Sequence, residues 1–226
     1  MDIALLSALN AARAARQAAV LVTDLDGQMP GRVVTADRLA DDPLAEAIRA
    51  AIRTGRSGLV PDTRTFLTVQ VPPAQMVVIG AVHITQALIP LARSLGYEPV
   101  VIDPRTAFAT ADRFPDVSIH AEWPDVALPP LKVDRYTAFI ALTHDPKIDD
   151  PALLHAFEKG CFYIGALGSR KTHAKRVERL GGQGASAEAI ARIKAPIGLA
   201  IGAITPTEIA VSIMAEVIQA WRQGIA

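Results

Sequence analysis

The sequence predicts an α/β fold in which a Rossmann-like parallel sheet is flanked by helices and preceded by a small, diverged α+β unit. Along residues 75–222, apolar segments alternate with amphipathic helical patterns, as in a parallel sheet with crossover helices. The apolar strand at residues 77–80 leads through a glycine turn into a predicted helix. Pro72-Pro73 interrupts the chain and separates the small unit (1–73) from the Rossmann-like domain (74–226).

In the N-terminal unit we expect a helix over residues 1–17 and strands over 18–23 and 66–71. A second helix should run from Asp42-Pro43 to Gly55. Asp42 would accept the first free N–H groups of this helix, and Pro43 fits the first helical position because proline has no N–H to leave unpaired.

In the main domain the expected elements alternate from residue 77 onwards. The expected strands cover residues 77–80, 99–103, 136–143 and 161–165. The expected helices cover 83–95, 150–160 (opened by Asp150-Pro151), 169–182 (capped by Ser169) and 205–221. Thr205-Pro-Thr-Glu208 forms a capping box at the start of the last helix.

The composition excludes several classes of function. The 226 residues carry 23 basic and 23 acidic side chains, which gives no electrostatic basis for binding nucleic acid or an anionic membrane. The basic residues predicted on helix 169–182 are expected on a solvated face; they are Arg170, Lys171, Lys175, Arg176 and Arg179. No apolar run approaches the roughly 18 residues that span a bilayer, and the start lacks the order of a secretory signal. We therefore expect a cytoplasmic protein.

Cysteine and histidine usage argues against a metal site. The lone cysteine, Cys161, excludes an internal disulfide and is expected to be an inert core residue rather than a sulfur-handling thiol. The five histidines show neither HxH nor HxxxH spacing, so no zinc site is expected. No GxSxG elbow and no P-loop occur.

The turn at Gly80 is typical of a dinucleotide site. Gly80 ends a strand, His83 starts a helix, and Asp103 ends the next strand, where an acid would bind ribose hydroxyls. Val82 stands where the pattern requires a second glycine, which weakens the prediction of NAD(P). A βαβ unit with no bound nucleotide explains the same residues. Arg105 could bind a phosphate or form a surface salt bridge.

Polar residues also follow two later strands, where ligands of open α/β sheets bind. Thr143, His144 and Asp145 follow one strand; His144 beside Asp145 could relay a proton, or Asp145 could cap the next turn. Gly165, Gly168, Ser169 and Arg170 follow the other. They could cradle an oxyanion, or Ser169 could cap the helix after ordinary glycine turns.

Five motifs in unbroken order resemble the C-terminal Rossmann domain of the XdhC/CoxF family. They are Val78-Ile-Gly-Ala-Val-His83, Val101-Ile-Asp-Pro-Arg105, Leu142-Thr-His-Asp-Pro-Lys147, Phe162-Tyr-Ile-Gly-Ala-Leu-Gly-Ser-Arg170, and Ala195-Pro-Ile-Gly-Leu199 continuing to Glu208. The resemblance covers about residues 76 to 222. It implies a maturation factor for molybdenum hydroxylases that binds the molybdenum cofactor, helps its sulfuration with a cysteine desulfurase, and delivers it to the apo-enzyme.

The chain departs from this family at two places. Val82 replaces the second glycine of the family's first turn. Residues 1–75 lack the glycine-rich, cysteine-containing segment usual in the family, so a cysteine-dependent role does not carry over.

The leading hypothesis is a non-catalytic accessory protein, with a homodimer expected for this class. Its expected ligand contacts are Gly80, His83, Asp103, Arg105, Thr143, His144, Asp145, Gly165, Gly168, Ser169, Arg170 and Glu208. A second hypothesis is an NAD(P)-dependent oxidoreductase with His144 as acid/base; here Val82→Gly should tighten NAD(H) binding. A third is a protein-interaction module without a ligand.

Overall fold

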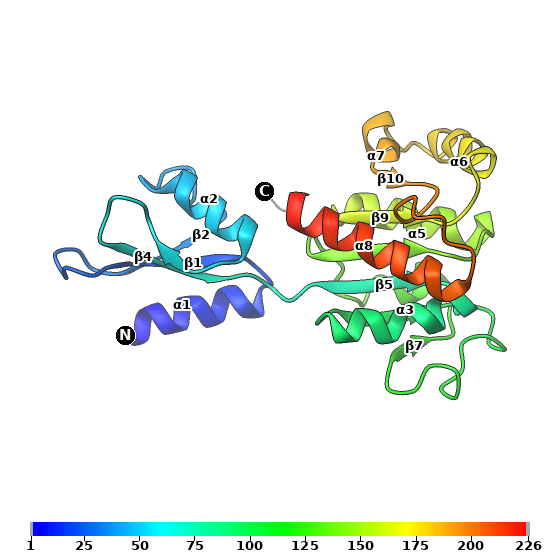
Figure 1. The fold of residues 1–226 in the computed structure, drawn as a ribbon, viewed down its shortest axis with the longest axis horizontal. Coiled ribbons are helices and arrows are strands. Elements are labelled where there is room, and N and C mark those ends of the chain that lie inside the picture. Colours follow the sequence, from blue (N-terminus) through cyan, green and yellow to red (C-terminus); the bar gives the residue numbers. More distant parts are fainter. Residues whose placement is uncertain (1, 225–226) are drawn as a thin grey trace. The chain divides into compact units, whose positions relative to one another are not determined.

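The computed structural model describes residues 2–224, so Met1 and residues 225–226 of the predicted domains lie outside it. The chain divides into two compact units: one contains the residues up to Pro72 together with those from Arg222 onwards, and the other covers Pro73–Trp221 (Figure 1). Each unit has its own sheet and its own apolar core. Among the described residues, no helix is long and apolar enough to cross a membrane.

The N-terminal unit is a four-stranded antiparallel sheet with two helices. Its strand order is β2-β1-β4-β3. The strands are β1 (Ala19–Asp24), β2 (Arg32–Thr35), β3 (Gly58–Leu59) and β4 (Thr65–Gln70), and the helices are α1 (Ile3–Ala14) and α2 (Ala45–Thr54). Val20 and Val22 of β1 pack against Ile48 of α2 and Leu67 of β4, which makes this an α+β unit as expected.

The start of α2 differs from the prediction. The helix begins at Ala45, and its N-cap is Leu44, whose side chain makes no capping hydrogen bond. Asp42 accepts the Leu44 N–H at 2.9 Å and two hydrogen bonds from the Arg32 guanidinium, at 2.8 and 3.0 Å. An arginine and a carboxylate form a strong bidentate pair, so the Arg32 contact fixes Asp42 ahead of the helix.

The main unit contains six parallel strands in the order β10-β9-β8-β5-β6-β7. Counted from β5 as the first strand, the order from β7 to β10 is the 3-2-1-4-5-6 order of Rossmann folds. The strands are β5 (Gln75–Ile79), β6 (Glu98–Ile102), β7 (Ser118–His120), β8 (Thr137–Ala141), β9 (Tyr163–Ala166) and β10 (Ile193–Lys194). The helices are α3 (His83–Ser94), α4 (Pro124–Ala127), α5 (Pro146–Glu158), α6 (Arg170–Gly182), α7 (Ala187–Ala191) and α8 (Pro206–Gly224). The predicted fold class is confirmed.

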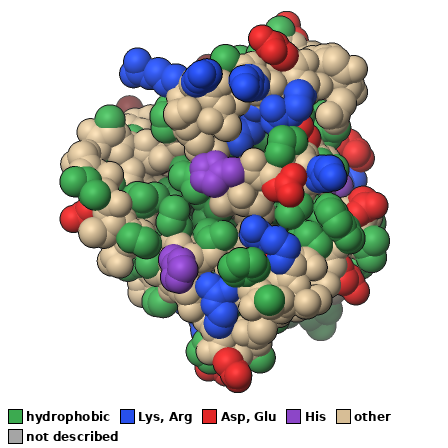
Figure 2. All heavy atoms as spheres, turned by 90° about the vertical axis from the view of Figure 1, so that its right-hand side faces the viewer, with side chains coloured by type: hydrophobic (Ala, Val, Ile, Leu, Met, Phe, Trp, Pro, Cys, Tyr) green, Lys and Arg blue, Asp and Glu red, His purple; other side chains and the backbone are tan. Residues whose placement is uncertain are grey.

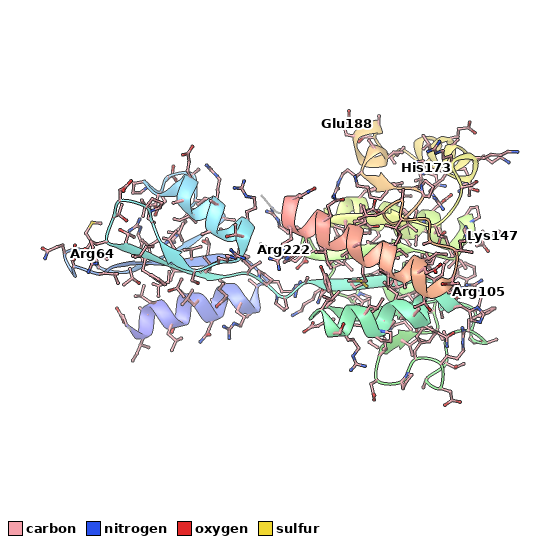
Figure 3. The ribbon with its side chains drawn as sticks, viewed as in Figure 1. Arg64, Arg105, Lys147, His173, Glu188 and Arg222 are labelled. Carbon is pink, nitrogen blue, oxygen red and sulfur yellow. The ribbon has the colours of Figure 1, made fainter. Side chains whose placement is uncertain are left out.

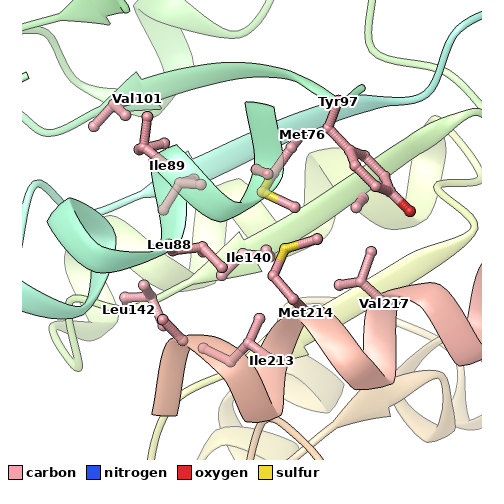
Figure 4. Packing of buried hydrophobic residues seen from close by; sticks show 14 of the residues in the cluster. Met76, Leu88, Ile89, Tyr97, Val101, Ile140, Leu142, Ile213, Met214 and Val217 are labelled. Carbon is pink, nitrogen blue, oxygen red and sulfur yellow. The ribbon is translucent and has the colours of Figure 1, made fainter. Parts of the chain in front are cut away.

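Helices cover both faces of this sheet. Alternate side chains of each strand point to opposite faces, and the apolar ones on each face pack against helices. Met76 and Val78 of β5 join the cluster that contains α3 and α8, which Figure 4 shows in detail. Val77 and Ile79 join the opposite cluster with α4 and α5. The sheet is therefore the middle of three layers, and its strand ends are the parts that remain free to bind a ligand.

The start of α5 was predicted wrongly. The helix begins at Pro146, and Asp145 is its N-cap, with Oδ1 accepting the Lys147 N–H at 2.9 Å. Pro151 lies inside the helix. Asp150 accepts hydrogen bonds from Arg179 of α6 at 2.6 and 3.1 Å, so packing against α6 determines its role.

The start of α8 was predicted correctly. Glu208 accepts the Thr205 N–H at 2.9 Å, and Thr205 Oγ1 accepts the Glu208 N–H at 3.3 Å. These two bonds form the reciprocal capping box.

Candidate functional site

The carboxyl ends of β5, β6, β8 and β9 bring most of the predicted site residues to one end of the main unit. Arg105 and Lys147 mark this end in Figure 3. Figure 2 faces the same end and shows Lys and Arg side chains toward the top, with histidine side chains nearer the middle. The strand order reverses between β5 and β8, which is where Rossmann folds form their ligand crevice.

Gly80 lies at this reversal point and needs to be glycine for two reasons. Its φ of +113° is a conformation that other residues rarely adopt. A Cβ at this position would lie 3.0 Å from Thr143 Cγ2 and 3.3 Å from the Leu142 carbonyl carbon. The turn after β5 therefore packs directly against the end of β8, and the two predicted motifs lie side by side.

Asp103 is fully buried, and neighbouring groups of the chain occupy its carboxylate. Oδ2 accepts the Ala81 N–H at 2.8 Å and an Arg105 Nη2–H at 2.7 Å, while Oδ1 accepts Nε–H and N–H of Arg105 at 2.9 and 3.0 Å. Asp103 thus positions the turn and Arg105, and the predicted ribose contact would require its carboxylate to give up these partners. Burial raises the pKa of Asp103, but the Arg105 and Ala81 hydrogen bonds outweigh it and hold the pKa below its ordinary value.

Arg105 forms the salt bridge that the sequence left as one alternative. Its guanidinium also lies over the Phe108 ring, 4.7 Å from the centroid, and its side chain is 37% exposed. The hydrogen bond to Asp103 chiefly raises the pKa of Arg105, and the charges of Asp145 and Asp149 add to the effect. Arg105 thus lies within electrostatic reach of the residues that follow β8.

Arg113 holds the other side of the Gly80 turn and was missed from the sequence. Its Nη1 donates to the carbonyl oxygens of Ala81 and Phe108, both at 2.8 Å, and Nη2 donates to Gln86 Oε1 at 3.0 Å. Both backbone groups of Ala81 are thus occupied by side chains of the chain itself. Arg113 lies in a loop 32 residues after Ala81, so no sequence pattern links the two residues.

Asp149 organises the loop after β8 and was also missed. Its Oδ1 accepts the Thr143 hydroxyl at 2.6 Å, and its Oδ2 accepts the His144 N–H at 3.1 Å. Thr143 Oγ1 in turn accepts the Asp145 N–H at 3.1 Å. His144 has φ of +63°, a left-handed conformation for which these bonds compensate. Burial raises the pKa of Asp149, against the Thr143 hydrogen bond and the charge of Arg176.

The His144–Asp145 proton relay is not supported by this geometry. Asp145 caps α5, which was the alternative left open, and the carboxylate that contacts His144 is Asp149, through the backbone. The His144 side chain lines a pocket instead.

Of the residues around β9, Gly165 was placed wrongly. It lies inside β9 and is buried, and a Cβ there would collide with Ile197 and the Tyr163 hydroxyl, both 2.6 Å away. Gly165 is therefore required by packing and offers no ligand contact. Gly168 has φ of +138°, and its Cβ would lie 3.8 Å from His144 Nδ1, so the loops after β8 and β9 are neighbours.

At the start of α6, the predicted cap is confirmed. Ser169 accepts the Thr172 N–H at 3.2 Å, and Arg170 is exposed at the first helical position.

Arg176 corrects the expectation that the basic residues of α6 all lie on a solvated face. Its side chain is 2% exposed; Nη2 donates to the Leu167 carbonyl oxygen at 3.0 Å and lies 3.8 Å from Asp149 Oδ2. Together with Lys171, Lys175 and Arg179 it lines a pocket of about 280 Å³ between α5 and α6. Its role was missed because spacing alone does not reveal that α6 packs against α5.

The remaining predicted residues lie as follows. His83 is exposed at the start of α3. The Glu208 carboxylate accepts the N–H groups of Ile204 and Thr205, so it serves the cap of α8. Cys161 is fully buried, and burial raises the pKa of its thiol to about 12, as suits an inert core residue. Residues 2–224 contain no group of three or more His, Cys, Asp or Glu side chains that could hold a metal ion.

Comparison with known proteins identifies the family of the main unit. The family model described as the XdhC Rossmann domain matches residues 76–217, which is the region that carries the sheet and all of the site described above. The chain belongs to the XdhC Rossmann domain family. The resemblance predicted from the five motifs is confirmed.

Relatives of this XdhC-type chain include two curated bacterial proteins. The molybdenum cofactor insertion chaperone PaoD of Escherichia coli (strain K12) is 32% identical over 146 residues, which are 65% of this chain and 40% of PaoD. A protein of Bacillus subtilis (strain 168), named as a probable xanthine dehydrogenase subunit, is 31% identical over 158 residues, 70% of this chain and 46% of that protein. The chain spans less than half the length of the curated relatives it matches.

A solved structure extends the similarity to the whole XdhC-type chain. The crystal structure described as a xanthine dehydrogenase from Bacillus halodurans aligns with 99% of this chain and 66% of that one, with a TM-score of 0.67 and 24% sequence identity. At that identity the likeness concerns the fold alone, and it includes the N-terminal unit.

Proposed function

We propose that this protein is a non-catalytic accessory factor that binds the molybdenum cofactor as cargo and delivers it to an apo-molybdenum hydroxylase. The similarity to the insertion chaperone PaoD carries the proposal, because it extends over 65% of this chain within the same family. The Bacillus subtilis relative, whose name refers to xanthine dehydrogenase, supports the same class of client enzyme.

The carboxyl ends of β5 and β8 are the proposed cargo site. The Gly80 turn and the Thr143 loop pack closely against each other there, because Gly80 has no Cβ. Arg105, His144 and Ser169 provide polar groups around it, and exposed His83 and Arg170 stand at its margins. Three further carboxylates would support the site without contacting the cargo, because they form hydrogen bonds within the chain. They belong to Asp103, Asp145 and Asp149.

Any sulfuration of the cargo would depend on a separate protein. Cys161 is the only cysteine in the sequence, and it is buried with a thiol pKa near 12, so it cannot present the thiolate that sulfur transfer requires. We propose that a cysteine desulfurase supplies the sulfur while the cofactor is held here. Handling of sulfur by the chain itself is not part of the proposal.

The geometry counts against the NAD(P)-dependent oxidoreductase. A dinucleotide in the usual pose needs free backbone donors at the glycine turn and a free acid at the end of the second strand. Here the Ala81 N–H and the Asp103 carboxylate are bound to each other. Val82, the N-cap of α3, packs against the core cluster beside the turn.

Retention of the cofactor tests the proposal. The purified chain would be mixed under anaerobic conditions with cofactor released from a molybdoenzyme and separated by gel filtration. Molybdenum and pterin are expected to elute with the chain at micromolar concentrations, close to one per chain. Absence of both from the protein fraction would reject cargo binding. Co-purification with a hydroxylase but without any cofactor would instead favour the protein-interaction module.

A further inference from the structure

Half of the side chains that line the pocket between α5 and α6 are cationic. Its wall consists of His144, Pro146, Asp149, Lys171, Thr172, Lys175, Arg176 and Arg179. Lys171, Lys175 and Arg179 recur every four residues, so they lie along one face of α6. Four cations therefore face a single carboxylate, and the Arg179 charge is already paired with Asp150 at 2.6 Å. The lysines and Arg176 leave a positive charge that the pocket itself does not balance.

Arg176 gives this pocket a buried donor whose hydrogen bonds are incomplete. Its Nη2 is bonded to the Leu167 carbonyl oxygen, but Nε and Nη1 have no hydrogen-bond partner among the described residues. The nearest carboxylate oxygen, Asp149 Oδ2, is 3.8 Å away and also accepts the His144 N–H. Buried N–H groups of a charged guanidinium are costly to leave without acceptors, because burial removes their water partners. An acceptor that enters the pocket would remove that cost.

We propose that this pocket binds the phosphate monoester of a small-molecule ligand, with Arg176 as the buried donor and Lys171 and Lys175 as the outer cations. Only the source of the phosphate rests on the proposed function, in which it is the phosphate group of the bound molybdenum cofactor. The assignment of an oxyanion site stands on the pocket itself.

The charge of the pocket favours a phosphate monoester over a carboxylate. A phosphate monoester carries about −1.5 to −2 charges near neutral pH, which matches the unbalanced cations better than a single carboxylate does. Arginine also presents N–H groups in a planar fork that suits phosphate oxygens. At about 280 Å³, the pocket is at the small end of ligand sites, so it holds the charged group rather than a whole cofactor.

The pocket is connected to the ends of β5 and β8 through a short series of contacts. Asp149 lies in the pocket wall and accepts the Thr143 hydroxyl, while Thr143 packs against Gly80. His144 lines the pocket and follows Thr143 directly. A ligand held at these strand ends could therefore place a terminal phosphate beside Arg176.

Titration with inorganic phosphate tests the oxyanion site without the cofactor. Binding would be followed by calorimetry at constant ionic strength, with chloride replacing phosphate in the blank. We expect saturable binding, weakened about tenfold in Lys175→Gln, because one charge-assisted contact is lost. Arg176→Lys keeps the charge but loses the fork and should weaken binding at least as much. If that variant does not fold, the exposed Lys171→Gln replaces it.

Arg93→Gln is the matched control. Arg93 is an exposed arginine in the last turn of α3 and is not part of the pocket wall. The phosphate affinity of the Arg93→Gln protein should stay within about twofold of that of the unmodified chain. No saturable phosphate binding, or equal loss in Arg93→Gln and Lys175→Gln, would overturn the inference.

The cofactor experiment separates this inference from the proposed function. Excess inorganic phosphate should displace retained cofactor from the chain, and Lys175→Gln should retain less than Arg93→Gln. Phosphate binding without cofactor retention would leave the pocket standing and reject the cargo. Cofactor retention that is unaffected by phosphate and by Lys175→Gln would support the cargo but reject the pocket as the site of the cofactor's phosphate group.

Discussion

Asp103 accepts the N–H of Ala81, 22 residues earlier in the chain, at 2.8 Å, and so ties the end of β6 to the turn after β5. The same carboxylate binds Arg105 through both oxygens. Asp103→Asn removes the negative charge that pairs with Arg105. It also puts an NH2 group where one carboxylate oxygen accepted hydrogen bonds. We expect a loss of about 2–3 kcal/mol in the free energy of unfolding. Urea denaturation measures it, and exposed Asp112→Asn, the control, should change stability by less than about 0.5 kcal/mol.

The same carboxylate makes stability depend on acid. Its folded pKa lies below the ordinary value, so the unfolded chain binds the proton more readily. The stabilisation is therefore complete above about pH 4, the unfolded pKa, and is lost as the pH falls through the folded pKa. Asp103→Asn should show a shallower decline than the unmodified chain below about pH 4. Parallel pH profiles for the two proteins would refute the assignment.

Gly80→Ala tests the close approach of the β5 turn to β8. The new Cβ would lie 3.0 Å from Thr143 Cγ2 in a backbone with φ of +113°. We expect a loss of about 2–4 kcal/mol, because strain and collision combine. Gly96 shares a positive φ (+82°) but has no atom within 4 Å of an added Cβ, so Gly96→Ala should cost only about 1 kcal/mol. Equal thermal shifts for the two variants would show that the contact with Thr143 is unimportant.

Cys161 should be chemically silent in the folded protein. Its side chain is fully buried, and burial raises its pKa to about 12, so little thiolate forms near neutral pH. Iodoacetamide at about pH 8 should label the chain in urea but not the native protein. Cys161→Ala should keep cofactor retention unchanged after a modest loss of stability, about 1–2 kcal/mol. Rapid labelling of the native protein would show that the Cys161 thiol is reactive. Loss of cofactor retention in a folded Cys161→Ala protein would show that the thiol is functional.

Val82→Gly distinguishes the cargo site from a dinucleotide site. Removing the valine clears the position where the Rossmann pattern has glycine, but the Ala81 N–H and Asp103 remain bound to each other. We expect no saturable NADH binding by fluorescence titration in either the unmodified chain or the variant. Saturable binding that tightens in Val82→Gly would support the oxidoreductase.

The fold was largely predictable, because its central strands are apolar throughout and its helices have clear ends. The strands near residues 77–80, 136–143 and 161–165 correspond to β5, β8 and β9, and the capping box at Thr205 starts α8. The strands β7 and β10 span three and two residues, too short for any periodic pattern, so the complete strand order could not be derived. The two aspartate–proline pairs at 145 and 150 compete as helix starts, and the contact between Asp150 and Arg179 distinguishes them only in three dimensions.

The positions of the candidate site residues were predictable, but their contacts were not. Ligands of open α/β sheets bind beyond the strand ends, so Gly80, Thr143 and Gly168 were selected from the sequence. The groups that organise them were not. Arg113, Asp149 and Arg176 act through contacts made by packing, and Arg176 directly follows the exposed Lys175 in the same basic helix. Asp103 was selected, but the sequence did not indicate that its carboxylate binds the Ala81 N–H within the chain.

Transfer of molybdenum from the loaded chain to an apo-hydroxylase tests the central claim most directly. The chain would be loaded anaerobically, freed of unbound cofactor by gel filtration, and mixed with an apo-molybdenum hydroxylase; molybdenum would then be quantified in each protein after separation. We predict that molybdenum leaves the chain and appears in the hydroxylase together with enzyme activity. A chain that emerges from gel filtration without molybdenum, or that keeps it while the hydroxylase stays inactive, would contradict the proposal.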